Sequence, residues 1–168
     1  MSGGLGNDIY EVTDAADGVN ELAGGGRDTV STSLASYTLG ANLESLFFGG
    51  SGNFTGTGNE LDNILVGGAG NDVLIGGAGF DVMAGGLGND VYEMTDIADV
   101  ALELAGEGSD SVSTSLSVFE LGANLEGLFF GGAGNFDVGM GNALDNTIAG
   151  GAGSDALFGM GGNDLLIG

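Results

Sequence analysis

The amino-acid sequence predicts an all-β fold in which short parallel strands stack into a solenoid. Three observations support this prediction. A glycine-rich turn of six residues recurs along the chain, a short apolar segment follows each turn, and neighbouring turns are nine residues apart. Because regular repetition of one short unit is typical of solenoids, we expect stacked coils.

The recurring turn has the pattern Gly-Gly-x-Gly-x-Asp. Glycine supplies the positive φ angles and tight bends that such a turn needs. The Val, Ile, Leu and Phe residues that follow suit β-strands. The pattern occupies residues 3–8, 67–72, 76–81, 85–90 and 150–155, and the variant GMGGND occupies residues 159–164.

The nine-residue spacing extends beyond these turns. From Gly40 onward, consecutive frames each begin with glycine, and most end in a short apolar strand, as GGAGNDVLI does. One turn and one strand make half a coil, so a coil takes two frames, and successive coils should pair as parallel strands roughly 4.8 Å apart. Side chains alternate along a strand, which should turn the eighth position of each frame inward: Leu65, Leu74, Met83, Tyr92, Leu157 and Leu166.

The chain also contains one long repeat, written twice. Placing Gly3 on Gly85 aligns GGLGNDIYEVTD with GGLGNDVYEMTD, and one inserted residue near Met140 lengthens the shift by one. The two copies are residues 3–84 and 85–167, and no linker separates them. We therefore expect residues 1–168 to form one continuous β-solenoid.

A spacer at residues 11–39, and again at 93–121, differs from the glycine-rich frames. The alternating residues 28–31 and 110–113 predict strands. Residues 96–104 could form a single helical turn or a strand, and we favour a strand or a loop. We expect two aromatic residues to fill a widened core, Tyr37 and Phe119. Four acidic residues of the spacer are interpreted as solvated charges: Glu11, Glu21, Glu93 and Glu103.

Charge excludes several classes of function. The chain has 24 acidic residues and one basic residue, Arg27, for a net charge of −23. Nucleic acids and acidic membrane surfaces need Lys and Arg, so neither is an expected partner. No apolar run approaches a membrane span, so we expect no membrane insertion. Because like charges oppose compaction, the fold should be completed by cations.

Calcium is the cation that the turns favour. It prefers six to eight hard oxygen ligands, which aspartate and the carbonyls of a glycine-rich turn supply. Turns on the same edge alternate, so ligands should pair two frames apart: Asp72 with Asp90, Asp81 with Asn63, and Asp164 with Asn146. Asparagine carries no charge, so its sites should bind more weakly. Phe54 and Phe136 replace the aspartate in two turns, which should hold no ion by this route.

The GGxGxDxUx frames resemble the hemolysin-type calcium-binding repeat of RTX proteins. The resemblance implies a parallel β-roll, a right-handed β-solenoid with calcium ions between glycine-rich turns. It also implies folding on calcium binding, outside the cell or at its surface after type I secretion. In that family the sixth-position Asp and backbone carbonyls enclose each ion, which here implies these metal-site residues: Asp8, Asn63, Gly68, Gly70, Asp72, Asp81, Gly86, Gly88, Asp90, Asn146, Asp155 and Asp164.

Two functions stay open at this point. One is a calcium-dependent structural module of a secreted or cell-surface protein. The other is a non-catalytic accessory domain of a secreted protease, lipase or polysaccharide epimerase. We do not expect an enzyme, because the turns use every regularly placed Asp and no nucleophile–His pair is available.

Two features favour self-association. Outward strand positions carry apolar residues that suit a contact surface: Val73, Ile75, Val82, Phe158, Leu165 and Ile167. The Asp155 turn of one molecule should also close a calcium site with the Asp8 turn of another, which predicts filaments. For the apolar residues, the alternative is that they reflect β propensity alone or are covered by the spacer. For the turns, the alternative is that the chain is a piece of a longer roll.

Overall fold

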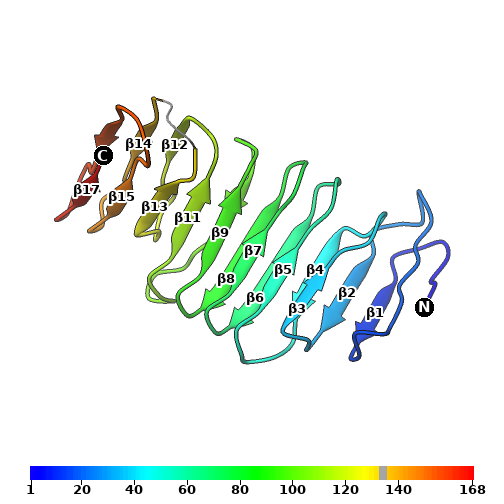
Figure 1. Ribbon diagram of the computed structural model, residues 1–168. Helices are drawn as coiled ribbons and strands as arrows, with labels where there is room; N and C mark the ends of the chain where they lie inside the picture. The colour runs from blue at the N-terminus through cyan, green and yellow to red at the C-terminus, as the bar shows by residue number, and fades with distance from the viewer. Residues whose placement is uncertain (133–135) are drawn as a thin grey trace.

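The computed structural model describes residues 1–132 and 136–168. It is an all-β solenoid of about nine turns, built from parallel sheets, with no helix among the described residues. The coils follow one another from the N-terminal to the C-terminal end, with the strands across the long axis (Figure 1). The fold class predicted from the sequence is confirmed. In the described part of the chain, no helix has the length and apolar character needed to cross a membrane.

Two long sheets form the faces of the solenoid, and each face is hydrogen-bonded between successive coils. The first sheet contains, in order, β1 (Ile9–Val12), β2 (Thr29–Thr32), β4 (Ser45–Phe48), β6 (Ile64–Ala69), β8 (Val82–Leu87) and β10 (Val100–Ala101). The second contains β3 (Ser36–Thr38), β5 (Thr55–Thr57), β7 (Val73–Ile75), β9 (Val91–Met94), β11 (Ser111–Thr114), β13 (Gly127–Phe130), β15 (Thr147–Ala149) and β17 (Leu165–Ile167). A three-stranded sheet contains β12 (Val118–Glu120), β14 (Val138–Met140) and β16 (Ala156–Phe158).

The strand register gives the length of each coil. In the glycine-rich frames, strand partners are two frames apart, as in Ile64 with Val82 and Val73 with Val91. In the spacer, Ile9 pairs with Thr29, and Thr29 pairs with Ser45. A coil that includes the spacer loop is therefore longer than the predicted two frames, and the next coil is shorter.

The core consists of the inward side chains between the two faces. Leu65, Leu74, Met83 and Tyr92 are completely buried, as predicted. Leu157 is half-buried against this core. Leu166 is 43% exposed, contrary to the prediction, because β17 has a neighbouring coil of this chain on one side only.

The spacer contains the predicted strands and two more that were not predicted, β3 and β12. β2 and β11 form where alternation predicts strands, and residues 96–104 contain only the two-residue strand β10. The two spacer aromatics, Tyr37 and Phe119, are half-buried and pack against the core. The chain therefore stays in register with the solenoid through a stretch that lacks the complete Gly-Gly-x-Gly-x-Asp pattern.

Corresponding strands of the two sequence copies lie in different sheets. β2 belongs to the six-stranded sheet, whereas β11, its counterpart in the second copy, belongs to the eight-stranded sheet. The same exchange relates β4 to β13 and β6 to β15. Each long repeat thus adds an odd number of half-coils, and β7 of the first copy pairs directly with β9 of the second.

Candidate metal sites

The residues just before the strands are linked from coil to coil, because the backbone N–H of one residue donates to the side-chain carboxylate of the corresponding residue in the next coil. The N–H of Asp72 donates to Oδ1 of Asp90 at 2.7 Å. The N–H of Asn63 donates to Oδ1 of Asp81 at 2.8 Å, and that of Asn146 to Oδ1 of Asp164 at 2.9 Å. The structure therefore brings together all three ligand pairs that the sequence places two frames apart.

These links continue into a carboxylate ladder along each edge of the solenoid. On one edge, the N–H of each residue donates to the carboxylate of the next in this order: Phe54, Asp72, Asp90, Asp110 and Glu126. On the opposite edge the same kind of bond forms three separate runs: Asp8, Asp28 and Glu44; Asn63, Asp81 and Asp99; and Asp137 and Asp155. Asp8 is therefore linked to Asp28 and Asp155 to Asp137, within this chain.

Six ladder carboxylates were missed from the sequence because they lie outside the complete glycine-rich pattern. A usable signal exists, since each is the residue directly before a strand, the place that aspartate takes in the repeated turn. These residues are Asp28, Glu44, Asp99, Asp110, Glu126 and Asp137.

The second oxygen of most ladder aspartates has no hydrogen-bond partner among the described residues. Oδ2 is buried and makes no hydrogen bond in Asp8, Asp28, Asp72, Asp81, Asp90, Asp137 and Asp155. Burying an unpaired carboxylate oxygen is costly unless an opposite charge or a donor compensates. These oxygens therefore point to a cation.

The first glycine of each turn makes room for that oxygen. A Cβ atom at Gly67 would collide with Oδ2 of Asp72, and one at Gly85 would collide with Oδ2 of Asp90. The same holds for Gly76 with Asp81. The glycine is needed here for space, in addition to the backbone freedom that the turn requires.

Backbone carbonyls supply further oxygen atoms between stacked turns. A Cβ atom at Gly86 would meet the carbonyl oxygen of Gly68, and one at Gly88 would meet that of Gly70. Gly86 and Gly88 have φ angles of 94° and 132°, which L side chains rarely adopt. The carbonyls therefore lie close to the next turn, and with the orphaned carboxylate oxygens they form an all-oxygen donor set that fits calcium.

The electrostatics of the ladder also favour a cation. Burial raises the pKa of Asp81 and of Asp90 to about 6, although backbone hydrogen bonds act in the opposite direction. Neighbouring carboxylates, such as Asp72 and Asp110 beside Asp90, raise these pKa values further. Burial likewise raises the pKa of Asp72 and of Asp110. The charged ladder is thus unfavourable by itself near neutral pH, and a bound cation would offset this cost.

The prediction for Phe136 is wrong. Phe136 is 61% exposed, and the next residue, Asp137, is 3% exposed and takes the ladder position. The inserted residue of the second copy therefore precedes Asp137. In the first copy, Phe54 does hold the ladder position, is 1% exposed, and stacks on Phe48 with ring centroids 4.6 Å apart.

The interpretation of two spacer glutamates is also wrong. Glu21 and Glu103 are buried, not solvated, and they accept hydrogen bonds from the hydroxyls of Tyr10 and Tyr92. Glu11 and Glu93 are exposed, as predicted. The missed signal is the segment ELAG, which occurs in both spacers and precedes a ladder aspartate each time.

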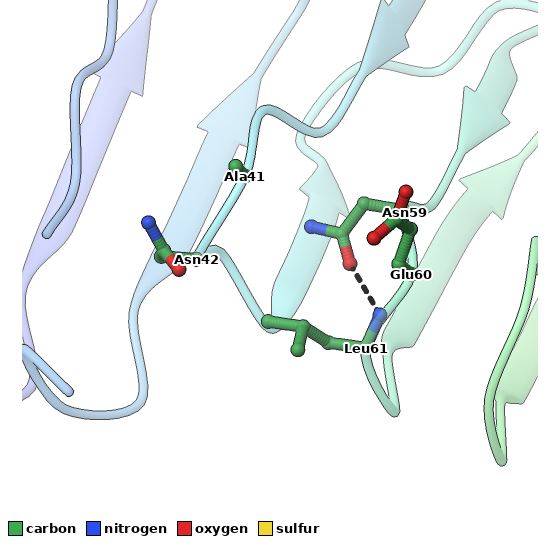
Figure 2. Close-up of a pocket in the computed structure, with 5 residues that line it drawn as sticks. All are labelled: Ala41, Asn42, Asn59, Glu60 and Leu61. Atoms are coloured by element: carbon green, nitrogen blue, oxygen red, sulfur yellow. Dashed lines mark hydrogen bonds between the residues drawn. The ribbon is translucent and has the colours of Figure 1, made fainter. Parts of the chain in front are cut away.

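A hollow on the turn surface offers no catalytic arrangement. Its lining is Ala41, Asn42, Asn59, Glu60 and Leu61, and Figure 2 shows the Asn59 side chain accepting a hydrogen bond from the Leu61 N–H at 2.9 Å. The Asn59 amide also donates to the carbonyls of Gly40 and Leu43. Glu60 is the one acid among these lining residues, so the hollow is held by turn contacts and lacks an acid–base pair.

Comparison with known proteins finds calcium-binding repeats among the glycine-rich frames. The family model of the RTX calcium-binding nonapeptide repeat matches four copies, at residues 57–92 and 140–168. A 70-residue stretch, 42% of this chain, is 51% identical to the endo-1,3-1,4-beta-glycanase ExsH of Rhizobium meliloti (strain 1021). The match spans only 15% of that relative's length. No solved structure matches the chain. This solenoid chain therefore contains RTX calcium-binding nonapeptide repeats.

Proposed function

We propose that residues 1–168 form one calcium-binding structural domain of a secreted or cell-surface protein, and that calcium completes its fold. The observation that carries this proposal is the pair of carboxylate ladders with buried, unpartnered oxygens. The chain contains a single basic residue, so cations from solvent must balance these charges. Pairing of β7 with β9 across the copy boundary supports treating the two copies as one unit.

The proposed ligands follow the ladders. One site takes Asp72 and Asp90, with carbonyls from the turns that contain Gly68, Gly70, Gly86 and Gly88. Weaker sites take Asn63 with Asp81 and Asn146 with Asp164, because an amide oxygen ligates without charge. The Asp8 and Asp155 turns complete the set.

Calcium titration followed by circular dichroism tests the proposal. Ligands that come together only in the fold turn binding free energy into folding free energy. We expect a largely disordered chain in chelator and a β-rich chain in millimolar calcium. Magnesium should substitute poorly, because it requires tighter octahedral geometry. An unchanged β spectrum and melting temperature in chelator would refute calcium-dependent folding.

The similarity to a glycanase favours a second candidate function, a non-catalytic region attached to a secreted enzyme that acts on a polysaccharide. The chain by itself should then release no reducing sugar from a mixed-linkage β-glucan in calcium. Sequencing the gene on both sides of this segment should reveal a catalytic domain. Hydrolysis by the isolated chain would contradict both candidates.

Head-to-tail association into filaments stays a prediction. It draws on the buried, unpartnered Oδ2 atoms of Asp8 and Asp155 and on the exposed side chains of Phe158, Leu165 and Ile167. Light scattering should show particles that grow with calcium and are lost when Asp8 and Asp155 are both replaced by alanine. A monomer at high protein and calcium concentrations would exclude this contact.

A further inference from the structure

Two clusters of three carboxylates lie where a glycine-rich turn meets the spacer. In the second copy the cluster is Asp90, Glu103 and Asp110, and in the first copy it is Asp8, Glu21 and Asp28. Each residue offers an oxygen atom, and the three oxygens lie within 4.8 Å of one another. We call these clusters the second and first triads. Each glutamate comes from the spacer loop, outside the nonapeptide repeats.

The second triad is buried and incompletely hydrogen-bonded. Asp90 and Asp110 are each 1% exposed and Glu103 is 8% exposed. Oδ2 of Asp90 and Oε2 of Glu103 are buried without a partner. In the first triad, Oδ2 of Asp8 and Oδ2 of Asp28 are likewise buried without a hydrogen-bond partner. These orphaned oxygens are independent evidence for a ligand, beyond the mere proximity of acidic groups.

The remaining oxygens are held in place by the protein. The hydroxyl of Tyr92 donates to Oε1 of Glu103 and accepts from the N–H of Gly85 at 2.6 Å. The N–H of Asp90 donates to Oδ1 of Asp110 at 2.8 Å. The bond from Tyr92 leaves Oε2 of Glu103 without a partner. Such outer contacts orient ligands before an ion enters.

The first triad has the corresponding bonds with one difference, because the N–H of Leu22 also donates to Oε1 of Glu21 at 2.8 Å, so both oxygens of that glutamate are hydrogen-bonded. The hydroxyl of Tyr10 donates to Glu21 and accepts from the N–H of Gly3 at 2.6 Å, and the N–H of Asp8 donates to Oδ1 of Asp28 at 2.8 Å. Its least buried member is Asp8, which is half-buried.

The geometry suits one divalent cation per triad. Calcium binds oxygens at about 2.3–2.6 Å, so two ligands of one ion are at most roughly 5 Å apart. All three triad oxygens meet this limit. Three carboxylates also carry more charge than the paired turns, and affinity for calcium rises with the charge of the ligands.

We propose that each triad binds one calcium ion, in a site that contains the spacer glutamate and binds more tightly than the nonapeptide sites. This inference rests on the proposed calcium-dependent fold and names a further class of site within it. Backbone carbonyls and water would complete the coordination. The tyrosine acts as a positioning residue for the glutamate.

Terbium luminescence offers a local probe of these sites. The chain has no Trp and three Tyr residues, two of which contact the triad glutamates. Terbium binds oxygen sites of the calcium type and emits when a nearby tyrosine is excited. We expect sensitised emission from the first two equivalents of terbium per chain, and its loss on competition with calcium. Tyr37→Phe should leave that emission unchanged.

The decisive variant replaces Glu21 and Glu103 with glutamine. It should lose this emission, and calorimetry should show two tight calcium ions fewer per chain or a roughly tenfold or greater loss of their affinity. The matched control replaces Glu11 and Glu93 with glutamine, which removes the same charge at exposed positions beside the same tyrosines. Equal calcium stoichiometry and affinity in the two variants would overturn the proposal.

A second variant keeps the test valid if the glutamine variant fails to fold. Replacing Tyr10 and Tyr92 with phenylalanine keeps every ligand and removes both sensitisers. Loss of emission is the expected result, with calcium still bound at the triads but roughly tenfold or more weakly, because each glutamate loses its positioning contact. Persistent emission would refute the location. Failure of the wider proposal is distinguishable, because the wild-type chain would then bind no calcium and show the same circular dichroism with and without chelator.

Discussion

At the scale of single residues, aspartate has the length that the ladder needs. One oxygen reaches the backbone N–H of the neighbouring coil, and the other is left in the interior of the turn. Asp72 and Asp90 show both features. The side chain therefore joins two coils directly and also leaves an oxygen free to bind a cation.

The first residue-scale prediction concerns this pair. Asp72→Ala and Asp90→Ala should both lower the stability of the calcium-bound fold and so raise the calcium concentration at the folding midpoint. The double variant should cost little more than Asp90→Ala, because groups that share one ion are not additive. Asp90→Ala should be the more severe of the two, since Asp90 also belongs to the second triad. Asp81→Ala should be milder, because its partner Asn63 carries no charge. Calcium titration by circular dichroism measures these midpoints, and simple additivity would contradict a shared site.

The second residue-scale prediction concerns the first glycine of a turn. Gly67→Ala should place a methyl group against the Asp72 carboxylate and destabilise the calcium-bound fold by about 1–3 kcal/mol. Gly52→Ala is the matched control, because a Cβ atom there meets nothing within 4 Å. Urea unfolding in saturating calcium should separate the two variants. Equal stability would show that the carboxylate can move aside freely.

At the scale of elements, the strands were predictable and the ladder only in part. Glycine spacing and side-chain alternation predict the buried residues Leu65, Leu74 and Met83, because both follow from backbone geometry. The spacing fails at Asp137, because a one-residue insertion within a turn moves the frame without changing the strand that follows. It fails at Glu21 and Glu103 because their burial depends on which coil stacks against the spacer.

The element-scale prediction tests the one ladder position that holds an aromatic residue. Phe54 packs between β4 and β5, on Phe48, where the second copy has Asp137. Phe54→Ala should cost about 3–5 kcal/mol, the usual range for a buried phenylalanine. Phe136→Ala serves as the control, because this exposed side chain should change stability by less than about 0.5 kcal/mol. Urea unfolding in calcium checks both, and similar losses would show that Phe54 contributes little to the packing of these coils.

At the scale of the whole molecule, the odd number of half-coils in each long repeat sets the distribution of charge. Asp8 and Asp28 precede strands of the six-stranded sheet, whereas Asp90 and Asp110 precede strands of the eight-stranded sheet. The two triads therefore lie on opposite edges. Negative charge thus runs along both sides of the solenoid, and calcium on one edge alone would leave the other uncompensated.

The whole-molecule prediction separates ion binding from simple screening of charge. A net charge of −23 expands the chain in chelator, where small-angle X-ray scattering should give a radius of gyration of roughly 43 Å, the value for an unfolded chain of this length. Millimolar calcium should reduce it toward roughly 15 Å, the value for a compact chain.

Potassium chloride at equal or higher ionic strength is the control for this scattering experiment. It screens exposed charges over a Debye length, but it supplies no ion that suits the buried aspartate oxygens. Potassium chloride should therefore shrink the chain only slightly and leave it without β structure. If salt alone produced the compact, β-rich state, charge repulsion would be the only obstacle to folding, and the buried ladder oxygens would need no calcium.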